Sequence, residues 1–166
     1  MSKYKEIKGF KVQTLASDTA ASVASTGTWS SGGNLNTARG QVVGFGVTAA
    51  AGAAMGTSPS LVTSFEQYDG SSWTETTDIN TAGRNGLGTG TLTAGLIYGG
   101  WPRAGKTESW NGSAWTEVAN LSTARFHGAV GSGPSAASAF LSGGPPPATN
   151  ATEDWSLDQN IKVIAD

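Results

Sequence analysis

The chain has 166 residues, enough for one ordinary domain, and it contains 24 glycines, six tryptophans and no cysteine. The lack of cysteine excludes a disulfide framework and thiolate chemistry, and no apolar run is long enough to cross a membrane. A net charge of -2 argues against a nucleic-acid-binding protein, which would have a broad basic surface. The N-terminus also lacks the apolar core of a signal peptide, so we expect a soluble protein made in a cytoplasm.

The first 35 residues are predicted to form an N-terminal arm. Four lysines against one glutamate give the first 11 residues a charge of +3. The stretch "IKGFKVQTL" resembles a strand with Phe10 and Val12 on one face, and "TGTWSSGGNL" resembles a repeat strand whose companions are missing. Strands with free edges tend to pair, so we expect residues 4–35 to add strands to a neighbouring subunit. The alternative is a frayed terminal arm.

One sequence pattern occurs three times along the chain. A tryptophan leads each copy, at Trp29, Trp73 and Trp115, with spacings of 44 and 42 residues. An arginine follows each of them, at Arg39, Arg84 and Arg125. A triplet of acid, any residue and aromatic begins at Glu66, Glu108 and Glu153. A run of small residues with an apolar patch and glycine ("AAAGAAMG", "AGLIYGG", "SAFLSGG") keeps the same step, and markers in step indicate structural repeats.

Each repeat is predicted to contain four short strands and almost no helix. Asp69-Gly70 and Asn111-Gly112 favour tight two-residue hairpin turns, because both residue types tolerate positive φ. These turns would join the acid-containing strand to the tryptophan-led strand. Four short strands in 40 to 50 residues are typical of a propeller blade. The predicted blades span residues 37–78, 80–119 and 122–165, and "IKVIAD" would close the last one.

The order of Gly-Gly, acid-x-aromatic, Trp and Arg resembles a kelch repeat. The stretch "ESWNGSAWTEVANLSTAR" is similar to a group of kelch-like proteins common in marine bacteriophages, and the resemblance extends from Gly27 to Trp155. It implies a β-propeller used for contact rather than for a reaction. It also implies that the chain is made in the host cytoplasm and becomes part of a virion.

The number of blades is where this chain departs from that family. Kelch propellers usually have more blades than the three predicted here, and three twisted blades cannot close a ring. Repeat units bury their surfaces against neighbours on both sides, so two apolar faces would be left open. We therefore predict a homo-oligomer, in which two copies would form a six-bladed ring with a two-fold axis. The alternative is that other virion proteins cover the open faces.

The repeated charged residues favour a structural role over catalysis. Glu66, Glu108 and Glu153 occur once per blade, as do Arg39, Arg84 and Arg125, and we expect blade-to-blade ion pairs or hydrogen bonds to backbone. His127 is the one histidine, too little for a metal site or a Ser-His pair, and we expect it to be a strand residue with a local hydrogen bond. "GTGTLTAG" lacks the lysine of a phosphate-binding loop. We expect no enzyme activity, no cofactor and no metal.

Residues that break the repeat are better candidates for recognition. Trp101 and Arg103 lie in "YGGWPRAGKT", a loop that should share one rim with the equivalent loops of the other blades. They could stack on a sugar ring or anchor a protein interface, and the alternative is that Trp101 covers the adjacent blade. The favoured function is a structural virion protein: a head decoration, fibre or tail-associated component. The other function considered is a module that binds a host surface glycan or receptor.

Overall fold

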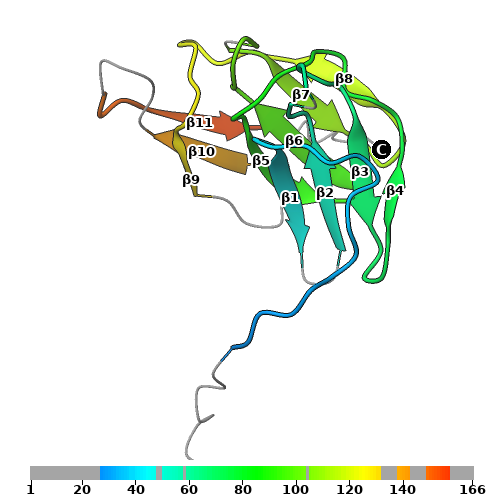
Figure 1. Ribbon diagram of the computed structural model, residues 1–166. Coiled ribbons are helices and arrows are strands. Elements are labelled where there is room, and N and C mark those ends of the chain that lie inside the picture. The colour runs from blue at the N-terminus through cyan, green and yellow to red at the C-terminus, as the bar shows by residue number, and fades with distance from the viewer. Residues whose placement is uncertain are drawn as a thin grey trace, which may run out of the picture. The chain divides into compact units, whose positions relative to one another are not determined.

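The computed structural model describes residues 27–47, 50–57, 59–103, 105–131, 138–142 and 149–157. The chain forms two compact units, residues 1–31 and 32–166. All strands of the described residues belong to the second unit, and the described residues contain no helix (Figure 1). The described residues therefore contain no helix that could span a membrane.

Two four-stranded antiparallel sheets follow each other along the chain. The first sheet has the order β1 (Val43–Val47), β2 (Ala50–Ala54), β3 (Phe65–Tyr68), β4 (Trp73–Glu75). The second sheet has the order β5 (Leu87–Thr91), β6 (Ala94–Tyr98), β7 (Thr107–Trp110), β8 (Trp115–Val118). The prediction of an all-β chain with four-stranded repeats is confirmed for these two sheets, which lie within the predicted blades 37–78 and 80–119.

Three described strands form the third sheet. Their order is β11 (Thr152–Ser156), β10 (Ser138–Ser142), β9 (Ala129–Gly131), again antiparallel. The predicted closing strand "IKVIAD" lies outside the described residues. The first strands of successive sheets are neighbours, since β1 contacts β5 and β5 contacts β9. This arrangement is consistent with propeller-like blades.

The strand register makes positions in the three sheets equivalent. The repeated glutamates pair with Ala53, Ile97 and Leu141 on the preceding strands, respectively for Glu66, Glu108 and Glu153. Counting from these pairs assigns equivalents wherever two sheets both contain the strand in question. The three glutamates were aligned from sequence alone, and the register agrees with that alignment.

The hairpin turns differ from the predicted geometry. Asp69 and Asn111 are not at the centre of a two-residue turn, because each is the first residue of a four-residue turn that its side chain closes. Asp69 Oδ1 accepts hydrogen bonds from the N–H groups of Ser71 and Ser72 at 2.8 and 2.9 Å. Only the glycines, Gly70 and Gly112, take positive φ, at 101° and 97°. The Asp and Asn are therefore favoured for their side-chain oxygens and not for their backbone freedom.

An aromatic cluster joins the first sheet to the second. Phe45 and Phe65 of the first sheet pack against Trp110 and Trp115 of the second, with Phe65 5.1 and 5.0 Å from the two indoles between ring centroids. Side chains alternate along a strand, so the other face of the second sheet carries Leu96 and Tyr98. Trp155 of β11 packs against that second cluster.

The segment before the first sheet contains no strand over residues 27–35. Its later part belongs to the second unit and contacts the first sheet, because the Trp73 indole Nε1 donates to the Gly33 carbonyl at 3.1 Å. Trp29 belongs to the first unit, and its side chain is fully exposed. Residues 1–26, with Phe10, Val12 and the four lysines, lie outside the described residues, so strand pairing of residues 4–35 with a neighbouring subunit stays a prediction.

Candidate functional site

Each of the three repeated glutamates accepts hydrogen bonds from the segment that precedes the first strand of its own sheet. Glu108 on β7 is the most enclosed of them, with a fully buried side chain. Its Oε2 accepts from the N–H and the Nδ2 of Asn80 at 2.7 and 2.9 Å. Its Oε1 accepts from the Thr81 N–H at 3.2 Å and from Arg103 Nη2 at 2.8 Å. Both carboxylate oxygens are thus occupied by donors of the same repeat.

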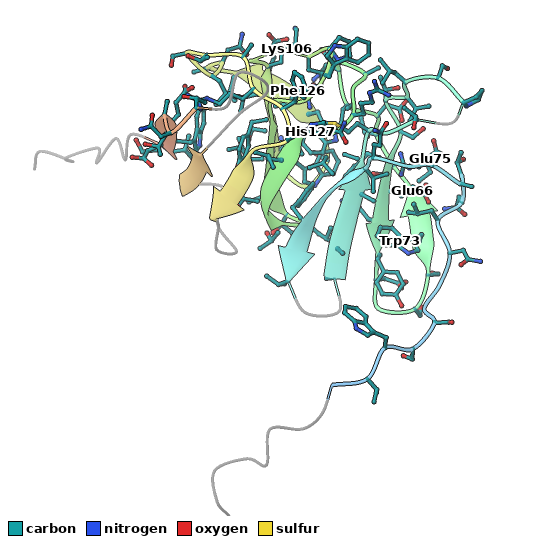
Figure 2. All side chains as sticks on the ribbon, turned by 60° about the vertical axis from the view of Figure 1, so that its left-hand side comes forward. Glu66, Trp73, Glu75, Lys106, Phe126 and His127 are labelled. Atoms are coloured by element: carbon teal, nitrogen blue, oxygen red, sulfur yellow. The ribbon has the colours of Figure 1, made fainter. Side chains whose placement is uncertain are left out.

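The first sheet has the same arrangement. Glu66 Oε2 accepts from the N–H and the Nδ2 of Asn36 at 2.7 and 2.8 Å, and its Oε1 accepts from Arg39 Nη2 at 3.0 Å. The Arg39 guanidinium also donates to the carbonyls of Ser64 and Ala53. Figure 2 shows Glu66 and Trp73 in this sheet. The predicted ion pair is present, but it lies within one repeat and does not link two blades.

The third sheet has a more exposed version. Glu153 accepts from the N–H and hydroxyl of Ser122 at 2.7 and 2.8 Å, and from Arg125 Nε at 3.1 Å. Burial alone would raise the pKa of Glu153, but the hydrogen bonds from Ser122, Arg125 and Thr123 outweigh burial and hold this pKa below its ordinary value. Glu153 is thereby held ionised as a structural acceptor.

Arg84 does not occupy the place that its position in the repeat predicts. The first and third copies read "NTAR" and "STAR", whereas the second reads "NTAGR", so Gly83 moves the arginine one residue along. Arg103, from the loop after β6, supplies the guanidinium to Glu108 instead. A Cβ atom at Gly83 would overlap the Arg103 side chain, so glycine is what allows the substitute arginine to pass. Burial lowers the pKa of the Arg103 guanidinium, and Glu108 opposes that shift.

Arg103 is therefore not available for surface recognition, because its side chain is fully buried against Glu108. The displaced Arg84 instead lies over Trp101, with Cζ 4.8 Å from the ring centroid, a cation–π contact. Arg84 Nη1 also donates to Gln41 Oε1 of the first repeat at 3.2 Å. Trp101 is 45% exposed and remains a candidate for recognition, now with Arg84 as its partner.

The sequence analysis did not foresee a ladder of backbone hydrogen bonds that joins the three sheets. Gln41, Asn85 and His127 each stand two residues before the first strand of their sheet, and each has a left-handed φ, at 57°, 55° and 61°. The Asn85 N–H donates to the Gln41 carbonyl at 3.1 Å, and the His127 N–H donates to the Asn85 carbonyl at 3.5 Å. The prediction that His127 lies in a strand is therefore wrong, because it is an exposed residue before β9 (Figure 2).

The charged side chains of the repeats make structural contacts with one another. Within the described ranges, no group of three or more His, Asp or Glu side chains is placed to hold a metal ion. The repeated carboxylates are ion-paired, and the exposed pair of Lys106 and Glu117 is a surface contact at 2.7 Å. What the geometry offers chemically is the exposed Trp101 with Arg84, and the half-buried Tyr68 and Trp73 on the first sheet.

Comparison of the sequence with protein-family models and with curated protein sequences gives no match. Among solved structures, the chain is similar to the structure of YjhT, with a TM-score of 0.61 at 13% sequence identity. The match covers 75% of this chain and 44% of that one, so the chain spans less than half the length of YjhT. At this identity the likeness concerns the fold alone: an all-β chain of successive antiparallel sheets.

Proposed function

We propose that this chain is a non-enzymatic structural protein of a bacteriophage virion, as a head decoration, fibre or tail-associated component. The observation that carries the non-enzymatic assignment is the state of the repeated glutamates. In the two complete sheets they are buried and each accepts from an arginine and an asparagine of its own repeat. A general acid or nucleophile needs a carboxylate that can reach a substrate, and these carboxylates have no such access.

The virion assignment is supported by the amino-acid sequence of the repeat. The stretch from Lys106 to Arg125 is similar to kelch-like proteins of marine bacteriophages. Its residues build β7, β8 and the connection that leads to Arg125, which pairs with Glu153. The stretch that carries the resemblance therefore corresponds to the last two strands of the second sheet and the connection to the third sheet.

The architecture that we propose is three kelch-like blades of an incomplete propeller, which other copies of the chain complete. The first sheet supports this, because its aromatic residues Tyr68 and Trp73 are half-buried where their equivalents in the second sheet are buried. Repeat proteins need neighbours or caps on their terminal units, and such surfaces mark sites of association.

The virion role is tested with particles of the phage that carries this sequence. Antibodies raised against the recombinant chain should label purified particles at regularly repeated positions in electron microscopy, and the chain should co-purify with them at a fixed copy number. Absence of the chain from purified particles would refute the structural virion role.

A module that binds a host surface glycan is the second candidate, and Trp101 favours it. A half-exposed indole backed by a guanidinium is a suitable surface for stacking on a sugar ring. The isolated protein should then be retained on immobilised surface polysaccharide of the host, and Trp101→Ala should abolish retention. The variant Lys106→Ala, at another exposed position of the same repeat, is the matched control. Equal retention of all three proteins would exclude a role of Trp101.

A further inference from the structure

The contact between the first two sheets shows how one sheet receives another. The face of the second sheet that points to the first is lined by Gly88, Gly95, Trp110 and Trp115, and we name these four positions the receiving face. The Phe45 and Phe65 rings of the first sheet pack against Gly95, Trp110 and Trp115, and Gly88 lies against Val43 and Gly44. The equivalent positions in the first sheet are Gly44, Ala51, Tyr68 and Trp73.

The receiving face of the first sheet is formed but not filled. Tyr68 and Trp73 stack on each other with centroids 5.2 Å apart at 36°, as Trp110 and Trp115 do at 5.2 Å and 39°. Trp110 and Trp115 are only 3% and 7% exposed because Phe65 packs on them. Among the described residues, Tyr68 and Trp73 have ring contacts only with each other, and both are half-buried.

The glycine at position 44 is a second indication that a strand of another sheet docks against β1. A Cβ atom on its equivalent, Gly88, would lie 2.8 Å from the Gly44 carbonyl oxygen, so glycine is required where β1 approaches β5. A Cβ atom on Gly44 would meet only the Gly52 carbonyl of its own sheet, at an ordinary 3.7 Å. The described part of this chain therefore gives no reason for a glycine at position 44, whereas a docked neighbouring strand would.

The residue types of the third sheet fit this face better than a copy of the first sheet would. Gly95 leaves room for the Phe45 ring, since its Cβ would lie 2.6 Å from that ring. Ala51 already has such a Cβ, so a phenylalanine could not enter at the same place. The position equivalent to Phe45 in the third sheet is Gly131, paired with Phe140. In such a contact, Gly131 of the third sheet would take the place of Phe45 and leave room for the Cβ atom of Ala51.

The backbone ladder also ends where such a contact would continue it. It runs from Gln41 through Asn85 to His127, one step for each sheet. Within the described ranges, the Gln41 N–H and the His127 carbonyl at its two ends have no hydrogen-bond partner. The third sheet of the same chain is turned to the second sheet through Trp155. Its other face is the one that a further copy can use.

We propose that the receiving face of the first sheet binds the third sheet of a second copy of this chain. In this contact the Gln41 N–H of one copy donates to the His127 carbonyl of the other, as Asn85 donates to Gln41 within the chain. The inference rests on the proposed homo-oligomer and assigns the surfaces that form it. The contact is head-to-tail, so it closes a ring only if every copy uses both surfaces.

The first test places a charge on the receiving face of the full-length chain. Gly44→Lys has room for its Cβ within one copy, but in the assembly it would bury an unpaired ammonium against the docked strand. Thr74→Lys, on the exposed outer strand β4 of the same sheet, is the control. Sedimentation should show that Gly44→Lys weakens self-association by more than about tenfold, whereas Thr74→Lys associates like the wild type. Circular dichroism verifies that both variants fold.

The second test uses the natural absence of cysteine. Gln41→Cys combined with His127→Cys should give a disulfide between copies under mild oxidation. The product would appear as covalent dimers or higher multimers when no reductant is present. Gln41→Cys combined with Asn85→Cys is the matched control, since the internal hydrogen bond predicts a disulfide within one copy.

The outcomes separate this inference from the proposed function. Assembly of Gly44→Lys at wild-type strength, with no disulfide between copies, would overturn the docking surfaces while leaving a homo-oligomer in place. A wild-type chain that sediments as a monomer would overturn both. Assembly that is lost on Gly44→Lys, together with the expected disulfide, supports the inference.

Discussion

The buried carboxylate at Glu108 offers the sharpest test of how a repeat is held together. Replacing it by glutamine keeps the shape but changes one acceptor into an NH₂ donor. Each carboxylate oxygen already faces two donors: Asn80 N–H and Nδ2 on one side, Thr81 N–H and Arg103 Nη2 on the other. Whichever way the amide turns, its NH₂ group therefore points at two donors and leaves them unpaired.

The magnitude follows from burial and from the number of donors lost. Removing one partner of a buried ion pair costs about 3 to 5 kcal/mol, because the other charge remains buried without compensation. We expect this range for Glu108→Gln and for Glu66→Gln, whose side chains are 0% and 1% exposed. Glu153 is 18% exposed, so water can replace the lost contact, and Glu153→Gln should cost about 1 to 2 kcal/mol.

Equilibrium unfolding in urea at neutral pH measures these differences as shifts of the midpoint at constant slope. The control is Glu117→Gln, which removes the exposed pair with Lys106 and should cost less than about 1 kcal/mol. If Glu108→Gln were no more destabilising than Glu117→Gln, the glutamates would not fasten the repeats in the way that the hydrogen bonds indicate.

Three further predictions concern other parts of the repeat. Arg103→Ala should destabilise the fold by about 3 kcal/mol or more and Arg84→Ala by less than about 1 kcal/mol, because only Arg103 pairs with a buried carboxylate; the reverse order in urea unfolding would contradict the exchange of arginines. Trp115→Ala should cost about 3 to 5 kcal/mol by removing a buried indole, and Trp73→Ala should cost less than Trp115→Ala in a non-associating background such as Gly44→Lys; equal losses there would argue against the difference in burial. Asp69 should titrate with a pKa of about 2, because first the Ser72 N–H and then the N–H and hydroxyl of Ser71 stabilise its carboxylate. Since the folded-state pKa is depressed, the turn keeps this contribution above the unfolded value of 3.8 and loses it as the pH falls through about 2; a midpoint near 3.8 in carboxyl NMR titration would be inconsistent with the turn geometry.

Much of the fold could be predicted from sequence because the acid-x-aromatic markers and the tryptophans of the first two sheets lie on strands. Glu66 and Glu108 fall on the third strand of their sheets, and Trp73 and Trp115 begin the fourth. Markers at strand positions keep their spacing, since a one-residue change would turn every side chain to the other face. The prediction of four short strands in each of the first two repeats followed from this spacing.

The partner of Glu108 could not be predicted in the same way. Arg84 aligns with Arg39 and Arg125 by eye, but one inserted residue, Gly83, puts it in a connection where spacing is not fixed by pleating. The signal was present as "NTAGR" beside "NTAR" and "STAR". That Arg103 replaces Arg84 depends on how the loop after β6 folds back, which no local pattern specifies.

The ladder itself was missed for a different reason. Gln41, Asn85 and His127 share a backbone conformation but no side-chain type, and their hydrogen bonds connect main-chain atoms. A search for chemical motifs therefore passes over them. Their common feature is position, two residues before the first strand of each sheet, which becomes visible only once the strands are known.

Association of this chain with further copies of itself is tested by the native mass of the full-length chain at micromolar concentration, measured by native mass spectrometry. We expect particles at a multiple of the 16.8 kDa chain mass, with no more than a minor monomer population. A compact monomer as the dominant species would contradict the claim that copies of this chain complete one another.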